Sequence, residues 1–92
     1  MKETMISKIN ESIQNGYAIA IGNTFGASAY CGSYSKFVPD GMNVYDSEIE
    51  IFNGGDLYCI PIDDSIRVEY NEDENSFSIY SEDKTWETRI YL

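Results

Sequence analysis

The segment Glu48-Ile49-Glu50-Ile51 alternates strictly between acidic and β-branched apolar residues and leads directly to Asn53-Gly54. Successive side chains of a strand point to opposite faces, so this alternation predicts a strand with one buried and one solvated face. Asn-Gly favours a tight hairpin turn because both residues tolerate positive φ angles. An apolar run over residues 57–60 follows, so the chain is expected to form an antiparallel hairpin here.

Further strands are predicted on both sides of this hairpin, with polar turns at residues 71–75 and 81–84. Pro61 lacks a backbone N–H donor, which indicates a sheet edge or a bulge at that position. Gly22 is expected to end the first strand. The predicted strands cover approximately residues 17–21, 45–52, 57–62, 66–70, 76–80 and 85–91.

An amphipathic helix is predicted over approximately residues 4–15, and Asn15-Gly16 supplies a typical helix end. Its apolar stripe is made by Met5, Ile6, Ile9 and Ile13. A chain of 92 residues has the size of one domain, so residues 1–92 are expected to share one core. The expected fold class is α+β, with one N-terminal amphipathic helix packed on a meandering antiparallel sheet of about four to six strands.

Residues 22–43 are rich in Gly and contain Pro39, so regular structure is hard to assign there, although a short strand fits residues 28–31. Backbone amides of residues 22–37 could face an anionic ligand. The segment lacks the spacing of known phosphate-binding loops and leads into no convincing helix. Tight packing of small residues or a bulged hairpin is the alternative interpretation.

Charge excludes several classes of function. The chain has six Lys and Arg, sixteen Asp and Glu, and no His, which gives a net charge of −10. Direct nucleic-acid binding requires a cationic surface, and anionic membranes repel an acidic protein. The absence of His removes most zinc sites and the common nucleophilic triads. We therefore expect a protein that is not an enzyme and has no cofactor.

Other chemistry is weakly supported by the residue pattern. Two acidic groups, Asp46 with Glu48 and Glu50, and residues 72–74, could attract a hard cation, but neither matches a calcium-binding loop. A paired-carboxylate hydrolase would need a larger cleft than this chain offers. Cys31 and Cys59 match no metal or redox motif and are expected to be buried, reduced thiols. Without an apolar run of eighteen residues or a signal-peptide pattern, the expected location is cytoplasmic.

The acidity belongs to one part of the chain, since residues 1–39 have a net charge of +1 and residues 40–92 a net charge of −11. Carboxylates and tyrosine rings together suit a partner rich in Lys and Arg. Solubility alone is the alternative explanation for acidic turns. The candidate partner-binding residues are Glu48, Glu50, Asp63, Asp64, Glu69, Tyr70, Glu72, Asp73, Glu74, Tyr80, Glu82 and Asp83.

In size, in acidity and in the acidic meander from Asp40 to Leu92, the chain resembles the small inhibitors that phages and mobile elements make against host nucleases. Anti-CRISPR proteins and uracil-DNA glycosylase inhibitors are the nearest classes. The resemblance implies a monomeric or dimeric protein that blocks the basic nucleic-acid-binding surface of a DNA- or RNA-handling enzyme, sterically or as a nucleic-acid mimic. The alternatives are an immunity protein against a nuclease toxin, a module that sequesters a small molecule or nucleotide through residues 22–37, and a phage assembly protein.

Overall fold

A computed structural model describes residues 1–25, 28–83 and 85–92, with the backbone alone for residues 24, 25 and 28–34; within these residues the chain forms one helix and eight strands. All strand pairs are antiparallel, which confirms the α+β fold class. The elements are α1 (Lys2–Gln14), β1 (Ile19–Phe25), β2 (Ser28–Phe37), β3 (Gly41–Val44), β4 (Glu48–Asn53), β5 (Asp56–Pro61), β6 (Ile66–Asn71), β7 (Ser76–Ser81) and β8 (Trp86–Tyr91).

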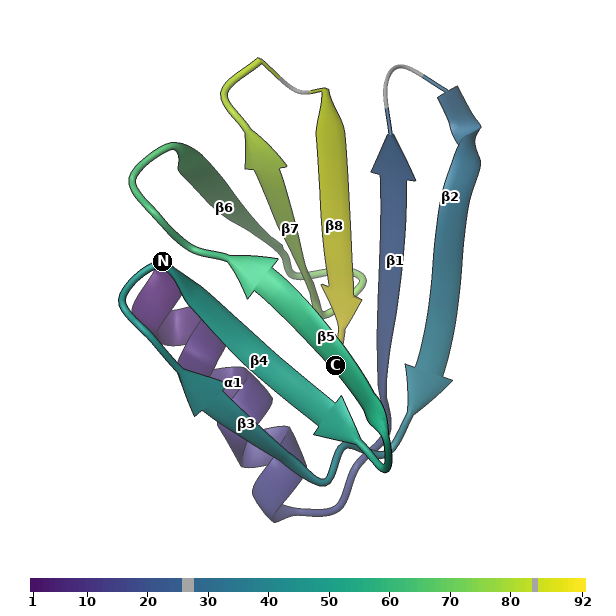
Figure 1. The fold of residues 1–92 in the computed structure, drawn as a ribbon, viewed down its shortest axis with the longest axis vertical. Helices are drawn as coiled ribbons and strands as arrows, with labels where there is room; N and C mark the ends of the chain where they lie inside the picture. Colours follow the sequence, from purple (N-terminus) through teal and green to yellow (C-terminus); the bar gives the residue numbers. More distant parts are fainter. Residues whose placement is uncertain (26–27, 84) are drawn as a thin grey trace.

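The strands form two sheets instead of the single meander of four to six strands that was expected. A five-stranded sheet has the order β2-β1-β8-β7-β6, and a three-stranded sheet has the order β3-β4-β5 (Figure 1). β1 and β8 pair along their length, from Ala20 opposite Tyr91 to Phe25 opposite Trp86. The first and last strands therefore lie side by side in the middle of the larger sheet.

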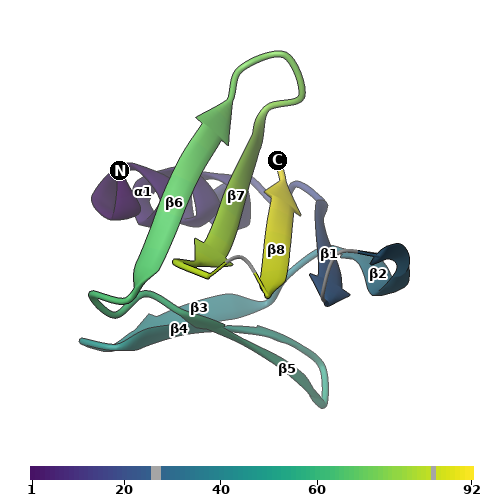
Figure 2. The ribbon, with the colours of Figure 1, turned by 90° about the horizontal axis from the view of Figure 1, so that it is seen from above.

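One hydrophobic core joins the helix and both sheets. Figure 2 looks onto the five-stranded sheet, with α1 behind β6 and β7 and the three-stranded sheet forming a layer along one side. The helix contacts β3, and Lys8 lies over the ring of Tyr70 in β6, so α1 closes the space between the sheets. The core residues are Met5, Ile9, Ile19, Ile21, Ile49, Ile51, Ile60, Ile62, Ile66, Phe77, Ile79 and Ile90.

The predicted hairpin is confirmed, but its turn lies one residue later than the expected Asn53-Gly54, because Asn53 pairs with Asp56. Ile49 and Ile51 are fully buried, and a two-residue loop of Gly54 and Gly55 joins β4 to β5, with Gly54 at a φ of 59°. The Ile62 N–H donates to the carbonyl of Ser47 on the β4 side. By alternation, an N–H at position 61 would point away from β4, so Pro61 costs the ladder no hydrogen bond on this edge strand.

The helix is also confirmed, with ends that differ slightly from the expectation. Met1 is the N-cap residue and makes no side-chain capping bond, whereas Asn15 caps the C-terminus and Gly16 follows at a φ of 70°. The left-handed conformation at Gly16 is why glycine suits this helix end. Within the described residues, no helix has the length and apolar character needed to cross a membrane.

Three local expectations are wrong or incomplete. β1 does not end at Gly22, because Gly22 is paired on both sides, with Tyr34 of β2 and Arg89 of β8. The short strand at residues 28–31 belongs to a longer strand, β2. Cys59 is exposed and not buried, since Ile60 takes the inward position of β5. The side chain of Cys31 lies outside the described residues.

Candidate partner-binding groove

A groove of about 470 Å³ lies on the outer face of the five-stranded sheet, beside the turn between β6 and β7. Its floor follows the strand register, in which Glu69 of β6 faces Ser78 of β7 and Ser78 faces Arg89 of β8. The lining carries four carboxylates and one guanidinium. The lining residues are Glu69, Tyr70, Asn71, Glu72, Asp73, Ser78, Glu87 and Arg89.

The turn at the end of the groove is held by Asn71. Its side-chain oxygen accepts hydrogen bonds from the backbone N–H of Asp73 at 3.0 Å and of Glu74 at 3.3 Å. Asn75 closes the turn at a φ of 49°, a left-handed conformation that Asn tolerates better than most residues. The carboxylates of residues 72–74 therefore project from a backbone that is fixed before any partner arrives.

Two polar contacts fix the floor of the groove. The hydroxyl of Tyr80 donates to Oε1 of Glu69 at 2.7 Å, and this hydrogen bond, with a smaller effect of burial, raises the pKa of Tyr80. Nε of Arg89 lies 2.5 Å from Oε2 of Glu87, and the hydrogen bond raises the pKa of Arg89. Arg89 therefore stays charged and offsets part of the negative charge of the groove.

Tyr70, one of the predicted partner-binding residues, is partly buried against the core. Its ring is half-buried and packs against Phe77 with centroids 4.8 Å apart, and Nζ of Lys8 lies 5.5 Å from its centroid. The hydroxyl donates to Oδ1 of Asn75 at 2.8 Å. These contacts tie the turn to the core, so the part of Tyr70 that lines the groove is held in place by them.

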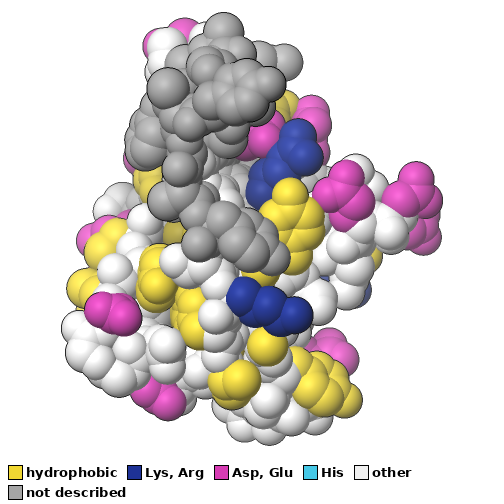
Figure 3. Space-filling model, turned by 90° about the vertical axis from the view of Figure 1, so that its right-hand side faces the viewer, with side chains coloured by type: hydrophobic (Ala, Val, Ile, Leu, Met, Phe, Trp, Pro, Cys, Tyr) yellow, Lys and Arg dark blue, Asp and Glu magenta, His cyan; other side chains and the backbone are white. Residues whose placement is uncertain are grey.

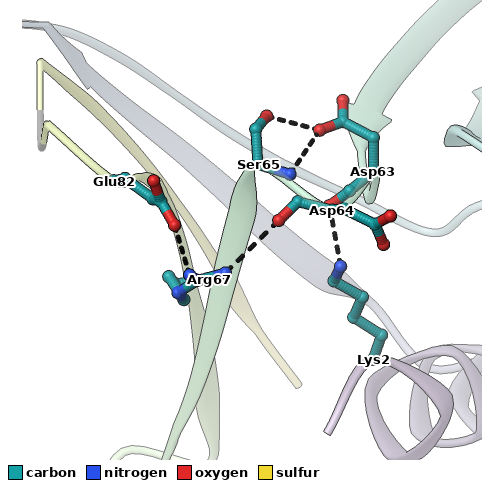
Figure 4. Close-up of polar contacts among 6 residues, drawn as sticks. All are labelled: Lys2, Asp63, Asp64, Ser65, Arg67 and Glu82. Carbon is teal, nitrogen blue, oxygen red and sulfur yellow. Dashed lines mark hydrogen bonds and ion pairs between the residues drawn. The ribbon is translucent and has the colours of Figure 1, made fainter.

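A second group of predicted residues lies where β5 passes into β6 (Figure 4). Nζ of Lys2 donates to the carbonyl oxygen of Asp63 at 2.7 Å, which ties the start of α1 to this corner. Oδ1 of Asp63 accepts from the hydroxyl and, at 2.8 Å, the backbone N–H of Ser65, and these hydrogen bonds lower the pKa of Asp63. Arg67 donates to the Asp64 carbonyl at 3.3 Å and pairs with Glu82. These acids therefore support the chain's own turns.

The remaining candidates lie in two other places. Asp83 accepts from the hydroxyls of Ser81 and Thr85 in the turn before β8. Glu48 and Glu50 are half-buried on the outer face of the three-stranded sheet. The structure therefore gathers Glu69, Tyr70, Glu72 and Asp73 in one groove, with Tyr80 and Glu74 beside it, and places the other six elsewhere.

The acidity is uneven in space as well as along the chain. Figure 3 shows the face at the right of Figure 1, where Lys and Arg side chains lie among hydrophobic ones and most Asp and Glu side chains lie toward the margins. The groove concentrates acids on another part of the surface. A partner would therefore meet a directional field and not a uniformly negative surface.

No cluster of three or more Cys, Asp or Glu side chains suited to a metal ion occurs among the residues with described side chains. Neither acidic group that the sequence offered as cation ligands, Asp46 with Glu48 and Glu50 or residues 72–74, therefore forms such a cluster. The ligand hypothesis concerned the backbone amides of residues 22–37. Apart from residues 26 and 27, which lie outside the described residues, this backbone forms the paired strands β1 and β2 and not an open loop.

Glu87 and Arg89 lie in the strand that was predicted over residues 85–91, but they were not among the predicted partner-binding residues. Ser78 was missed altogether. The available signal was the strand alternation, which puts Ser78 and Glu87 on outward positions of β7 and β8. Alternation gives the face on which a residue lies but not the register between strands, and it is the register that brings these residues beside Glu69.

No family model, curated protein or solved structure matches this chain.

Proposed function

We propose that this chain is a non-enzymatic inhibitor that binds the basic nucleic-acid-binding surface of a nuclease or another DNA- or RNA-handling protein. The observation that carries the proposal is the groove with its four carboxylates and single guanidinium, in a chain of net charge −10. Carboxylates held by strands and by the Asn71 turn lose little freedom on binding, which favours affinity. A channel lined by Lys and Arg would meet them with charge-assisted hydrogen bonds.

The proposed mechanism is steric and electrostatic. Opposite charge steers the inhibitor to the cationic channel, and the bound domain then occupies the space that DNA, RNA or a guide–target duplex would take. The carboxylates of Glu69, Glu72 and Asp73 stand in for phosphates, and the β6–β7 turn enters the channel first. The inhibitor supplies no chemical step.

The cytoplasm is the proposed compartment. Cys59 is a free, exposed thiol, which suits a reducing environment. Nuclease targets of this kind act on nucleic acid inside the cell. An immunity protein that neutralises a nuclease toxin would use the same surface physics, so it is the second candidate function.

The test is affinity capture from bacterial lysate with the tagged protein at about 50 mM salt, followed by elution at about 500 mM, where screening shortens the range of charge interactions. We expect one nucleic-acid-handling enzyme in the eluate. The triple variant E72K/D73K/E74K should not retain it. A matched variant, E3K/E11K/D46K, changes the net charge equally at exposed positions outside the groove and should retain it.

Capture that is equal for all three proteins would contradict a role for the groove. Capture of nothing, with a small molecule copurifying instead, would favour sequestration by residues 22–37. Thermal unfolding of each variant is the folding control, because the substituted side chains are all exposed.

A further inference from the structure

The outer face of the three-stranded sheet is a second surface of unusual composition. Strand register arranges nine residues in three rows across β3, β4 and β5, and Figure 1 looks onto this face with no helix or strand in front of it. We call these nine residues the outer platform. Its rows are Gly41, Phe52 and Leu57; Asn43, Glu50 and Cys59; and Tyr45, Glu48 and Pro61.

The first row is an apolar shelf. The ring edge of Phe52 lies close to Gly41, where an added Cβ would come within 2.6 Å of Cε2 of Phe52. Leu57, opposite Phe52 on β5, is 53% exposed. Glycine at position 41 thus leaves room for the ring of Phe52, which forms an apolar area with Leu57 on an otherwise polar face.

The other two rows carry negative charge that is not neutralised. Glu48 and Glu50 lie two residues apart on one face of β4, at a spacing of about 7 Å. Within the described part of the chain, no Lys or Arg forms an ion pair with either carboxylate. A hydrogen bond to Glu50 raises the pKa of Tyr45, as expected for a phenol beside an uncompensated carboxylate.

Charge decides what can cover the outer platform. A second copy of this chain would bring like carboxylates together across a two-fold axis, on top of a net charge of −10 for each copy. A segment with Lys or Arg near an apolar residue would instead bury the shelf and neutralise both acids. Aromatic and Arg side chains are also the groups that most often anchor protein interfaces.

We propose that the outer platform docks an extended segment of a basic partner protein, with a large apolar side chain on Phe52 and Leu57 and Arg or Lys side chains opposite Glu50 and Glu48. An extended segment that runs along β4 repeats its same-face side chains at the same spacing as Glu48, Glu50 and Phe52. The matching pattern is therefore basic, any, basic, any, apolar. This surface is separate from the groove, so the docking proposal can be disproved without affecting the proposed function.

The probe is the synthetic peptide Arg-Thr-Arg-Thr-Trp-Thr with blocked ends, titrated into the ¹⁵N-labelled full chain. We expect the largest amide shift changes on β4 and β5, and a dissociation constant that rises about fivefold in E48Q/E50Q, as two partly exposed ion pairs are lost. The variant Leu57→Asn should also weaken binding. The scrambled peptide Arg-Thr-Trp-Thr-Arg-Thr, with its apolar residue between the two bases, should bind less tightly.

The matched control is E3Q/E11Q, which removes two exposed carboxylates that belong to neither the outer platform nor the groove and should leave peptide affinity unchanged. Equal weakening by both double variants would overturn the proposal, because it would show general attraction to an acidic protein. Shift changes confined to the groove would overturn it too. So would a dimer of the free protein, seen by sedimentation velocity, that Leu57→Asn dissociates. Unchanged amide spectra away from the substituted residues verify that each variant folds.

Discussion

Cys59 is the residue at which the electrostatics of the outer platform can be measured directly. Partial desolvation, followed by the charges of Glu48 and Glu50, raises the pKa of the Cys59 thiol. Only the thiolate reacts with alkylating agents, so this exposed thiol should react slowly at neutral pH.

In a Cys31→Ser background, E48Q/E50Q should therefore increase the rate constant for iodoacetamide alkylation of Cys59. The rate should increase because loss of the two charges lowers the pKa of the thiol and enlarges the thiolate fraction. The control variant E72Q/D73N should react at the parent rate. An unchanged rate in E48Q/E50Q would show that these carboxylates do not act on the thiol.

Gly41 is the residue that allows the ring of Phe52 to approach the backbone of β3 closely. Gly41→Ala should destabilise the protein by about 1 kcal/mol, since the ring must move to admit the methyl group. Urea unfolding measures the loss. In a Phe52→Ala background the same substitution should cost much less, and an equal cost in both backgrounds would indicate a backbone effect instead of this contact.

At the scale of elements, local sequence patterns predicted the elements that are stabilised by contacts between residues close in the chain. Residues 48–53 and 56–61 form the expected hairpin because Ile49 and Ile51 alternate with acidic residues before a glycine turn and an apolar run follows it. β3 was missed because four residues between Pro39 and Asp46 carry too little periodicity. β1 continues through Gly22 because β2 and β8 pair with it on both sides, a tertiary effect that outweighs the weak strand propensity of glycine.

The turn between β7 and β8 gives a prediction about pH. Oδ1 of Asp83 accepts from the hydroxyl of Ser81 at 2.6 Å, and from the hydroxyl and backbone N–H of Thr85 at 2.9 and 3.2 Å. These hydrogen bonds, that of Ser81 first, lower the pKa of Asp83 below its ordinary value of 3.8. A lowered pKa in the folded state stabilises the fold above that ordinary value, and this stabilisation is lost as the pH falls through the folded-state pKa.

The unfolding free energy of the parent should therefore exceed that of Asp83→Asn near neutral pH, and the difference should shrink below about pH 4. Urea titrations at several pH values from about 2 to 7 provide the comparison, and Ser81→Ala should show the same trend more weakly. Parallel curves for the parent and Asp83→Asn would mean that this carboxylate is not held by the turn.

At the scale of the whole molecule, the division into two sheets controls which acids can act together. Alternation shows that Glu48 and Glu69 both point outward, but it fits one continuous sheet as well as two. The observed order puts Glu69 beside β7 and β8 and leaves Glu48 on a different face. Strand order and register depend on contacts between distant residues, so the sequence predicted the acids and their exposure without their grouping.

The two surfaces also make different demands on a partner. The groove is acidic with a polar floor, whereas the outer platform joins an apolar shelf to two carboxylates. A partner held by the groove alone should dissociate readily as salt rises, because screened ion pairs supply most of its affinity. Apolar contact on the outer platform would add a component that salt does not weaken.

The most direct measurement is the dissociation constant of the complex with the captured nucleic-acid-handling enzyme, determined from about 50 to 500 mM salt for the parent and for E72K/D73K/E74K. The proposed function predicts that the affinity of the parent falls steeply with salt and that the variant binds weakly throughout, mainly through slower association. An affinity that is independent of salt, or equal for the two proteins, would contradict it.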